Sequence, residues 1–418
     1  MKYRPPFLLS AAGSERATAY GFSNKSVTLN GRTHVVWLDR VARVCGRTFD
    51  HASATWGETR ALFEGYDNHT SPALIADSFA NPHLRIIFGP HGFGWNGGQF
   101  RWAISENPGA LERWKWENNV GYGATYASFV HLPQGVDALA YRGGEWPPSV
   151  MFQRQHALQH WTKAREIFRQ DVEPRYTHYN ATLACDAKGV LYLACHFYHE
   201  DVHGRHPGEI PRSHGMAILK SVDIGETWTD LRDAPVALPA LYEERLAIPP
   251  AGANMYLEGV SLDSQDSPWV LASSPDAADR RMLLSHWTAR DWETHDVSPA
   301  LPPDRTAVDC TLTIDTGDCL HIAATTVYTD ALPTGSAEEC WAHPSSEIFH
   351  LFGRDPQHGL TARQVSLPDD SVPNWLPNIS LNGPCQPVEK PVILYTHGSA
   401  DTDHTSATGN GVYCVMIE

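Results

Sequence analysis

Two histidines, a tyrosine and an arginine lie at matching ends of neighbouring apolar segments, in an arrangement suited to proton transfer beside an anionic group. His69 precedes one apolar segment and His91 follows its antiparallel partner, so pairing brings both imidazoles to the same end. Tyr126 and Arg142 flank the next pair of segments in the same way. Imidazole and phenol groups transfer protons, and a guanidinium binds a carboxylate through two parallel hydrogen bonds. These four residues are the predicted catalytic group.

Further polar and aromatic side chains near the same segment ends are predicted to bind substrate. They are Asn68, Trp95, Tyr176, Tyr179, His196 and Tyr198. Trp95 could stack on a sugar ring, and a core or rim position is an equal alternative. Packing is also the competing interpretation for Tyr176 and Tyr179. Gly143 and Gly144, directly after Arg142, leave room for a ligand beside the backbone.

The elements that must position these residues repeat along the chain. Each repeat is an apolar strand, a turn rich in Asp, Asn or Gly, and a second apolar strand. Copies lie at residues 27–37, 73–88, 129–141, 181–195, 260–271, 312–324 and 379–395. A repeat of about 40–50 residues made of strands indicates a β-propeller. The sequence therefore predicts an all-β, seven-bladed propeller as a single domain over residues 1–418, with its site where the inner strands converge.

Local signals refine this prediction. Ser221, Asp223, Gly225, Thr227 and Trp228 match the Asp-box pattern S-x-D-x-G-x-T-W, which is typical of sialidase-like propellers and indicates no reaction. Residues 412–417 are expected to complete one blade with strands from both chain ends, which removes an open sheet edge. A short helical turn is expected at residues 161–168.

Composition excludes several classes of function. The net charge is −16 with no basic stripe, so no nucleic-acid partner is expected. No apolar run reaches 18 residues, so no membrane span is expected. Residues 1–10 lack a signal-peptide core, which favours the cytoplasm, or a secreted or periplasmic protein if a signal was removed. A monomer or a small homo-oligomer is expected.

The eight cysteines are expected to be free thiols, because no CxxC pair occurs and no secretion signal is visible. Cys310 and Cys319 flank one turn and could be thiols, a disulfide or two metal ligands. His196 and His199 have the i, i+3 spacing of a metal site, with Cys195 or Cys319 as further ligands in some register. The sequence assigns no metal ligand.

The motifs in residues 66–144 resemble the BNR-4 propeller family, which includes ulvan lyases and rhamnose–glucuronate lyases. They are Asp67-Asn68-His69-x-x-Pro72, a strand ending in Gly89-x-His91, then Tyr126, then Tyr141-Arg142-Gly143-Gly144. The resemblance implies a lyase acting on an anionic, uronate-containing glycan. It implies no cofactor for the chemistry, and leaves a structural Ca²⁺ or Zn²⁺ open.

The resemblance also implies residue roles. His69 would be the general base, Tyr126 the general acid and His91 a supporting group, while Arg142 would bind the uronate carboxylate. Tyr176 or Tyr179 would line the sugar site. This fits β-elimination from a 4-linked uronate, which needs a neutralised carboxylate, a base for the C5 proton and an acid for O4.

Two other functions stay open. A sialidase-type glycoside hydrolase would need paired carboxylates or an arginine cluster. The candidate carboxylates are Glu64, Asp67, Glu258 and Asp309, and the candidate arginines are Arg142, Arg175 and Arg305. A propeller that binds carbohydrate or protein without catalysis is the other alternative, because a fold alone decides no function.

Overall fold

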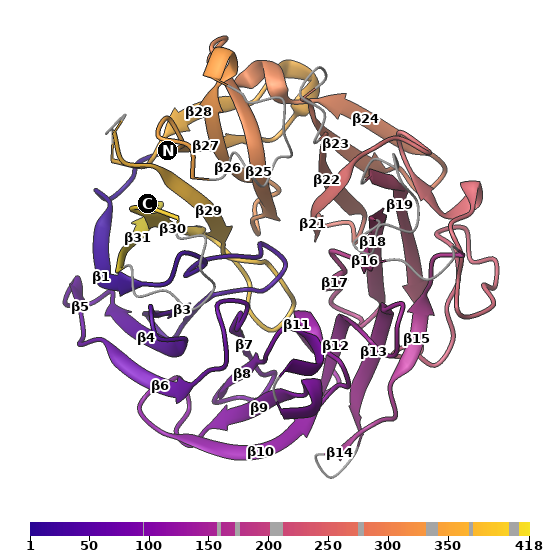
Figure 1. The fold of residues 1–418 in the computed structure, drawn as a ribbon, viewed down its shortest axis with the longest axis horizontal. Coiled ribbons are helices and arrows are strands. Elements are labelled where there is room, and N and C mark those ends of the chain that lie inside the picture. The colour runs from indigo at the N-terminus through magenta and orange to yellow at the C-terminus, as the bar shows by residue number, and fades with distance from the viewer. Residues whose placement is uncertain are drawn as a thin grey trace.

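The strands form seven antiparallel sheets arranged in a ring (Figure 1). The computed structural model describes residues 1–94, 96–156, 160–171, 176–200, 212–274, 280–331, 342–367, 371–400 and 409–418. In these ranges each sheet has four or five strands. The predicted all-β, seven-bladed propeller is confirmed.

The first four blades follow the chain in order. The first blade contains β2 (Ser26–Leu29), β3 (Arg32–Leu38), β4 (Arg43–Asp50), β5 (Thr55–Trp56) and β6 (Arg60–Glu64), and the second contains β7 (Ala73–Ala76), β8 (Leu84–Phe88), β9 (Phe100–Ser105) and β10 (Trp114–Val120). The third blade contains β11 (Thr125–Leu132), β12 (Val136–Gly143), β13 (Ser149–His156), β14 (His160–Trp161) and β15 (Arg165–Phe168). The fourth contains β16 (Tyr176–His178), β17 (Thr182–Cys185), β18 (Leu191–Glu200), β19 (Arg212–Ser221) and β20 (Ala247–Ile248).

The last three blades complete the ring. The fifth blade contains β21 (Tyr256–Leu262), β22 (Pro268–Ser273), β23 (Met282–Trp287) and β24 (Trp292–Asp296). The sixth contains β25 (Arg305–Ile314), β26 (Leu320–Tyr328), β27 (Glu347–Gly353) and β28 (Thr361–Gln364). The seventh contains β29 (Asn374–Ile379), β30 (Val392–His397), β31 (Asn410–Met416) and β1 (Phe7–Gly13). Short 3₁₀ turns lie between strands at Gly92–Gly94, Asn96–Gly98, Glu244–Leu246, Ser298–Ala300, Thr329–Ala331 and Pro356–His358.

Strands from both chain ends close the ring, as the sequence predicts. β1 pairs with β31 through Phe7 opposite Cys414 and Leu8 opposite Tyr413. β31 pairs in turn with β30. The last blade therefore contains the first and the final strand of the chain, which protects the edges that an open arc of sheets would leave.

Aspartates stabilise the hairpin turns that follow several inner strands. Oδ1 of Asp186 accepts hydrogen bonds from the backbone amides of Lys188 and Val190, both at 2.8 Å. Asp263 and Asp315 cap the corresponding turns of the next two blades in the same way. Backbone amides in a turn have no carbonyl acceptor on a neighbouring strand, so the carboxylate accepts their hydrogen bonds instead.

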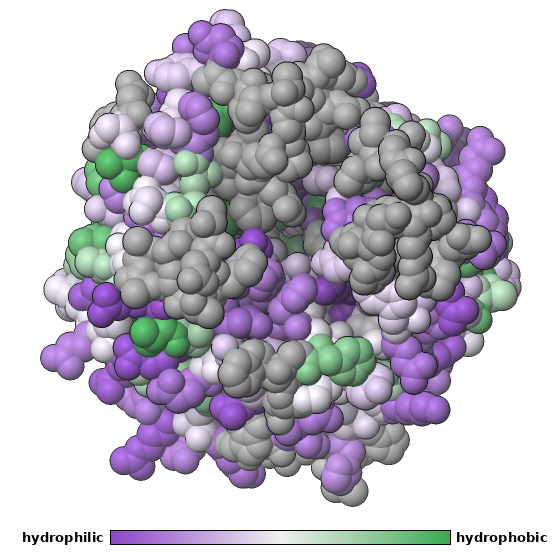
Figure 2. Space-filling view, viewed as in Figure 1, coloured by the Kyte–Doolittle hydropathy of each residue, from purple (hydrophilic) through white to green (hydrophobic). Residues whose placement is uncertain are grey.

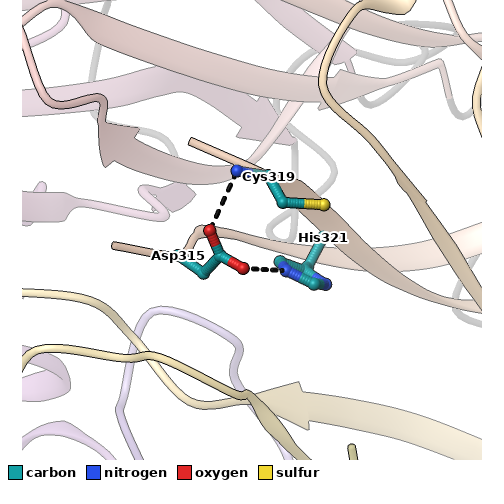
Figure 3. A group of neighbouring side chains, drawn as sticks. All are labelled: Asp315, Cys319 and His321. Atoms are coloured by element: carbon teal, nitrogen blue, oxygen red, sulfur yellow. Dashed lines mark hydrogen bonds and ion pairs between the residues drawn. The ribbon is translucent and has the colours of Figure 1, made fainter. Parts of the chain in front are cut away.

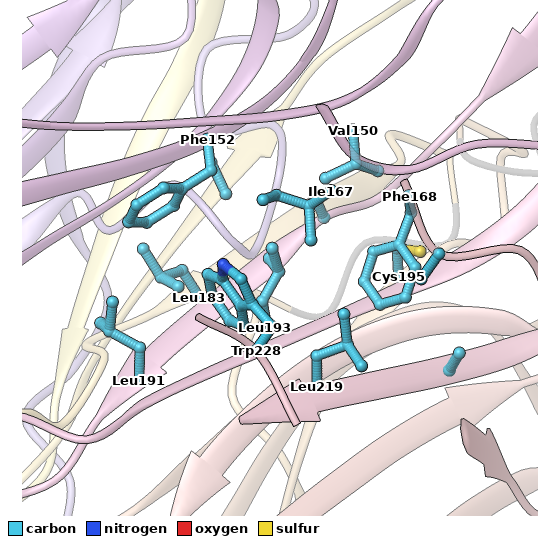
Figure 4. Packing of buried hydrophobic residues seen from close by; sticks show 14 of the residues in the cluster. Val150, Phe152, Ile167, Phe168, Leu183, Leu191, Leu193, Cys195, Leu219 and Trp228 are labelled. Carbon is cyan, nitrogen blue, oxygen red and sulfur yellow. The ribbon is translucent and has the colours of Figure 1, made fainter. Parts of the chain in front are cut away.

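The Asp box forms the predicted turn. Asp223 accepts from the backbone amide of Thr227 at 2.8 Å and from its hydroxyl at 2.6 Å. Gly225 has a φ of 83°, a backbone conformation that favours glycine. Trp228 is buried against Phe152, with ring centroids 5.4 Å apart, in the core shared by two blades (Figure 4). The box therefore joins neighbouring blades and carries no reactive group.

One local expectation is wrong. Residues 161–168 form no helical turn: His160–Trp161 and Arg165–Phe168 are strands that pair with β13. The free backbone edge of β13 and the apolar Phe168 favour pairing over a short isolated helix. The expectation of free thiols is confirmed for Cys310 and Cys319, and Cys310 Sγ lies 3.4 Å from Met282 Sδ. Among the described residues, no helix is long and apolar enough to cross a membrane.

The innermost strands are bulged near the axis. The register shifts between Thr125 and Ser128 in β11, between Leu257 and Gly259 in β21, and in β25 and β29 as well. A bulge inserts an extra residue and turns its side chain in a new direction. Figure 2 shows the surface hollowed near the centre of the ring, where hydrophilic residues gather.

Candidate functional site

One carboxylate holds the two predicted catalytic histidines in place. β7 pairs with β8 through Ala73 opposite Ile87, so the segments that carry His69 and His91 leave the same end of the hairpin. Oδ1 of Asp67 accepts from the backbone amide of His69 at 2.8 Å, and Oδ2 accepts from that of His91 at 3.1 Å. The imidazole rings stack with centroids 4.4 Å apart.

The next blade brings Tyr126 and Arg142 to the histidines. Thr125 pairs with Arg142 across β11 and β12, and Tyr126 follows in the bulge with a φ of 63°. The Tyr126 ring lies 6.3 Å from the ring of His69 and 6.1 Å from that of His91. The structure therefore brings the four side chains of the predicted catalytic group together.

Arg142 is fixed by three neighbours. Its Nη2 donates to Nε2 of His91 at 2.9 Å, and its Nη1 donates to the Tyr176 hydroxyl. Its guanidinium also lies 4.9 Å from the centre of the Tyr126 ring. A guanidinium only donates, so Nε2 of His91 accepts and its ring proton resides on Nδ1. In this arrangement His91 orients Arg142 as a neutral imidazole.

Tyr126 keeps its proton. Its side chain is buried, and this burial raises the pKa of the phenol well above 10. Tyr20 raises this pKa further, whereas the positive charge of Arg142 lowers it. A phenol that stays neutral at neutral pH can donate a proton to a leaving oxygen.

Sequence reasoning missed two residues of this cluster, Arg16 and Tyr20. The Tyr20 ring lies 4.8 Å from Tyr126 and 6.4 Å from His69. Nη1 of Arg16 donates to the Tyr20 hydroxyl at 2.8 Å. Both residues lie before the first repeat, where no hairpin pattern indicates a position in space.

The comparison with protein families decides the family of the chain. Residues 32–300 match the model of the BNR repeat-containing family. The chain belongs to this family. This BNR repeat protein is also 21% identical to an ulvan lyase of Nonlabens ulvanivorans over 303 residues, which cover 63% of each chain.

Solved structures share the fold of this BNR repeat protein. A PL25 ulvan lyase superposes with a TM-score of 0.74 and 14% identity, covering 99% of this chain and 96% of the other. The same coverage and score hold for such a lyase bound to -[GlcA(1-4)Rha3S]-. The polysaccharide lyase Uly1 gives a TM-score of 0.61 at 13% identity, with both chains fully covered.

Two of the predicted substrate-binding residues lie in or beside the cluster of this BNR repeat protein. Tyr176 accepts from Arg142, and its ring lies 6.3 Å from that of Trp146. Asn68 is buried and donates to Oε1 of Glu15, so it ties the His69 segment to the segment of Arg16. Trp95 lies outside the described residues.

The other three have different contacts. Tyr179 is fully buried in a hydrophobic core, where its hydroxyl accepts from the backbone amide of Gln170 at 3.1 Å. His196 is also buried and accepts from the backbone amide of Leu257 at 3.1 Å, and burial lowers its pKa to about 3. Tyr198 is half-buried and donates to Glu200. The structure thus gives Tyr179 and His196 structural partners rather than an open position at the cluster.

The candidate carboxylates divide in the same way. Glu64 is exposed, and Asp67 binds backbone amides. Glu258 and Asp309 lie on neighbouring inner strands and are half-buried in the structure. Burial raises the pKa of Glu258 to about 7 and that of Asp309 well above its ordinary range, where the charge of Glu258 adds to the shift. The two carboxyls are therefore near enough for the charge of one to disfavour ionisation of the other.

Of the candidate arginines, Arg142 belongs to the cluster. Arg305 lies 3.8 Å from the centre of the Tyr328 ring and donates to the carbonyl of Ser345. Arg175 lies outside the described residues. Arg16 is the second arginine near Tyr126, and it was not among the candidates.

Within the described ranges, one group of side chains has donor atoms suited to a metal. Donor atoms of Asp315, Cys319 and His321 lie within 4.8 Å of one another (Figure 3). Asp315 accepts from the Cys319 amide at 2.9 Å and lies 3.1 Å from Nε2 of His321. The first of these bonds is the turn cap found in other blades, which accounts for the position of Asp315. His196 and His199, the other pair considered as metal ligands, are not part of this group, and His199 stacks on His214 at 4.1 Å between centroids.

Proposed function

We propose that this protein is a polysaccharide lyase that cleaves a 4-linked uronate of an anionic glycan by β-elimination. The observation that carries the proposal is the cluster of His69, His91, Tyr126 and Arg142, in which a fixed guanidinium adjoins a neutral phenol and two imidazoles. The similarity to an ulvan lyase, together with the shared fold of the PL25 ulvan lyase bound to -[GlcA(1-4)Rha3S]-, supports a glucuronate-type, rhamnose-containing glycan as substrate.

Arg142 binds the carboxylate of the uronate. The C5 proton is only weakly acidic while the adjacent carboxylate is ionised. The guanidinium must therefore neutralise the carboxylate and stabilise the negative charge of the enolate-like intermediate. His91 keeps Arg142 in place through its Nε2. Loss of one such stabilising donor raises the barrier by about 3–4 kcal/mol.

His69 removes the C5 proton, and Tyr126 protonates the leaving O4. The C5–H and C4–O4 bonds break, and a C4–C5 double bond forms in the uronate. The proton taken by His69 returns to the phenolate of Tyr126 through solvent, which restores both groups. Burial of Tyr126 supports its part as acid, because it keeps the phenol protonated before the reaction. Each step uses side chains, so we expect the rate to be unchanged in a chelator.

The test follows the product. Glycans that contain glucuronate, including ulvan and gum arabic, are incubated with the protein, and the far-ultraviolet absorbance of the new double bond is recorded. His69→Ala and Arg142→Ala should abolish the signal, whereas His160→Ala, an exposed histidine on β14, should not change it. Depolymerisation without this absorbance would refute elimination.

A glycoside hydrolase is the second candidate, favoured by the carboxyl pair of Glu258 and Asp309. Two neighbouring carboxyls with raised pKa values can act as acid and base in glycoside hydrolysis. Hydrolysis would release reducing sugar without absorbance and would be lost in Glu258→Gln. The same incubation therefore separates the two functions.

A further inference from the structure

A second arginine–tyrosine pair adjoins Tyr126. Arg16 donates to the Tyr20 hydroxyl at 2.8 Å, just as Arg142 donates to the hydroxyl of Tyr176. The Tyr20 ring is 4.8 Å from that of Tyr126, and the guanidinium of Arg142 is 4.9 Å from its centre. Two such pairs, from distant parts of the chain, therefore contact one phenol.

The backbone of Tyr20 is held in a conformation that other residues support. Its φ of 69° is uncommon outside glycine. Its carbonyl accepts from the amide of Ser23 at 2.9 Å and from the side chain of Asn378 at 3.1 Å. Such a conformation persists only where its surroundings fix it, and it is frequent at ligand sites. The pair is therefore positioned before any ligand arrives.

The positive charge of Arg16 reaches the reacting region. Its side chain is 19% exposed, and its Nε lies 4.0 Å from Oε1 of Glu15, an oxygen that also accepts from Asn68. Burial raises the pKa of Tyr126, and the charges of both Arg142 and Arg16 counter this rise. Because the chain carries a net charge of −16, capture of an anion depends on such local cations.

The position of the pair indicates its ligand. A general acid that protonates a glycosidic oxygen lies at the junction of two sugars. Side chains around Tyr126 can therefore contact the sugar on either side of the cleaved bond. Arg142 is assigned to the uronate. We infer that Arg16, held by Tyr20, binds a second acidic group, a sulfate ester or a carboxylate, on the sugar across the cleaved bond. This inference rests on the proposed lyase function.

Binding to a catalytically silenced protein tests the inference. In a Tyr126→Phe background, calorimetry compares Arg16→Gln with the parent on three oligosaccharides: sulfated ulvan fragments, the same fragments desulfated, and a β-1,4-glucuronan with a carboxylate on every sugar. Arg16→Gln should weaken binding roughly 10- to 100-fold where the second acidic group is present, with a smaller salt dependence. Loss on the sulfated fragments alone assigns a sulfate ester, and loss on glucuronan alone assigns a carboxylate.

Two further variants separate recognition from folding. Arg16→Lys keeps the charge and should recover part of the affinity. Arg47→Gln is the matched control, because Arg47 lies on β4 of the first blade and donates to the carbonyl of Gly57 in that blade and to the carbonyl of Leu9 on β1. Equal loss on all three oligosaccharides, or no loss on any, overturns the subsite. If the wild-type protein forms no unsaturated product and Tyr126→Phe binds none of the three oligosaccharides, the lyase function is refuted together with the subsite. If the wild-type protein forms unsaturated product and Arg16→Gln does not change oligosaccharide affinity, only the subsite is refuted.

Discussion

The carboxylate of Asp67 offers a direct test of how the site is assembled. Each of its oxygens accepts one backbone amide, from His69 at 2.8 Å and from His91 at 3.1 Å. Asp67→Asn keeps the size of the side chain but replaces one acceptor oxygen by an amide NH2, which can only donate. One of the two amides then faces a donor instead of an acceptor, so one histidine segment must move.

The expected effect is on turnover more than on binding. A hydrogen bond to a charged group contributes about 1.5–3 kcal/mol, and the half-buried position of Asp67 favours the lower end. A displacement of about 1 Å between catalytic groups lowers a rate by about 100-fold. We therefore expect kcat to fall roughly 10- to 100-fold, with KM changed by less than about threefold, because Arg142 still holds the carboxylate.

Asp186→Asn is the control for this experiment. Asp186 also accepts two backbone amides, at 2.8 Å each, but in a hairpin turn of the fourth blade. Both variants should lose about 1–3 kcal/mol of unfolding free energy in denaturant titrations, and only Asp67→Asn should lose turnover. If the two variants show the same kcat, the placement of the two histidines by Asp67 does not matter for the reaction.

Other substitutions probe the remaining parts of the site and its support. Tyr126→Phe should lower kcat about 100- to 10,000-fold while oligosaccharide binding persists, and a wild-type pH–rate profile in this variant would contradict the acid role. Arg142→Lys keeps the charge but loses the planar fork that reaches His91 and Tyr176, so kcat/KM should fall about 100-fold, measured by product absorbance. Burial lowers the pKa of Lys25 to about 7, so the unfolded chain binds more protons between that pH and 10.5. Wild-type stability should therefore rise with pH by about 1.4 kcal/mol per unit in this window, and Lys25→Met should lack this slope in denaturant titrations at pH 8 and 9.5.

The architecture could be predicted from sequence because its signals are local. Each hairpin shows apolar strands around a turn residue such as Asp186 or Asp263, and the Asp box specifies its own turn through Asp223. The strand at Arg165–Phe168 was missed because its pairing with β13 depends on a residue 18 positions away, Val150 opposite Phe168. A short segment does not show in its own residues which edge it will join.

The candidate site was predicted in part for the same reason. His69, His91, Tyr126 and Arg142 follow from the rule that matching ends of antiparallel strands meet. Tyr20 belongs to no repeat, so no rule of pairing places it.

Tyr179 shows the converse limit of the sequence argument. It lies in the irregular stretch between β16 and β17, where alternation of side chains fails. The sequence therefore could not show that its hydroxyl meets the amide of Gln170 within the core.

The two ends of each inner hairpin have different roles, and this difference explains where chemistry is located. At the turn end, the carboxylates of Asp186, Asp263 and Asp315 accept amides of their own turns. At the other end, the strands separate toward neighbouring blades, and side chains there must find partners across blades. Asp67 binds two segments of its own blade, but Arg142 reaches a histidine of the second blade and a tyrosine of the fourth. Such partnerships can form only when neighbouring blades pack together, so packing of the second, third and fourth blades is a requirement for the site as well as for the fold.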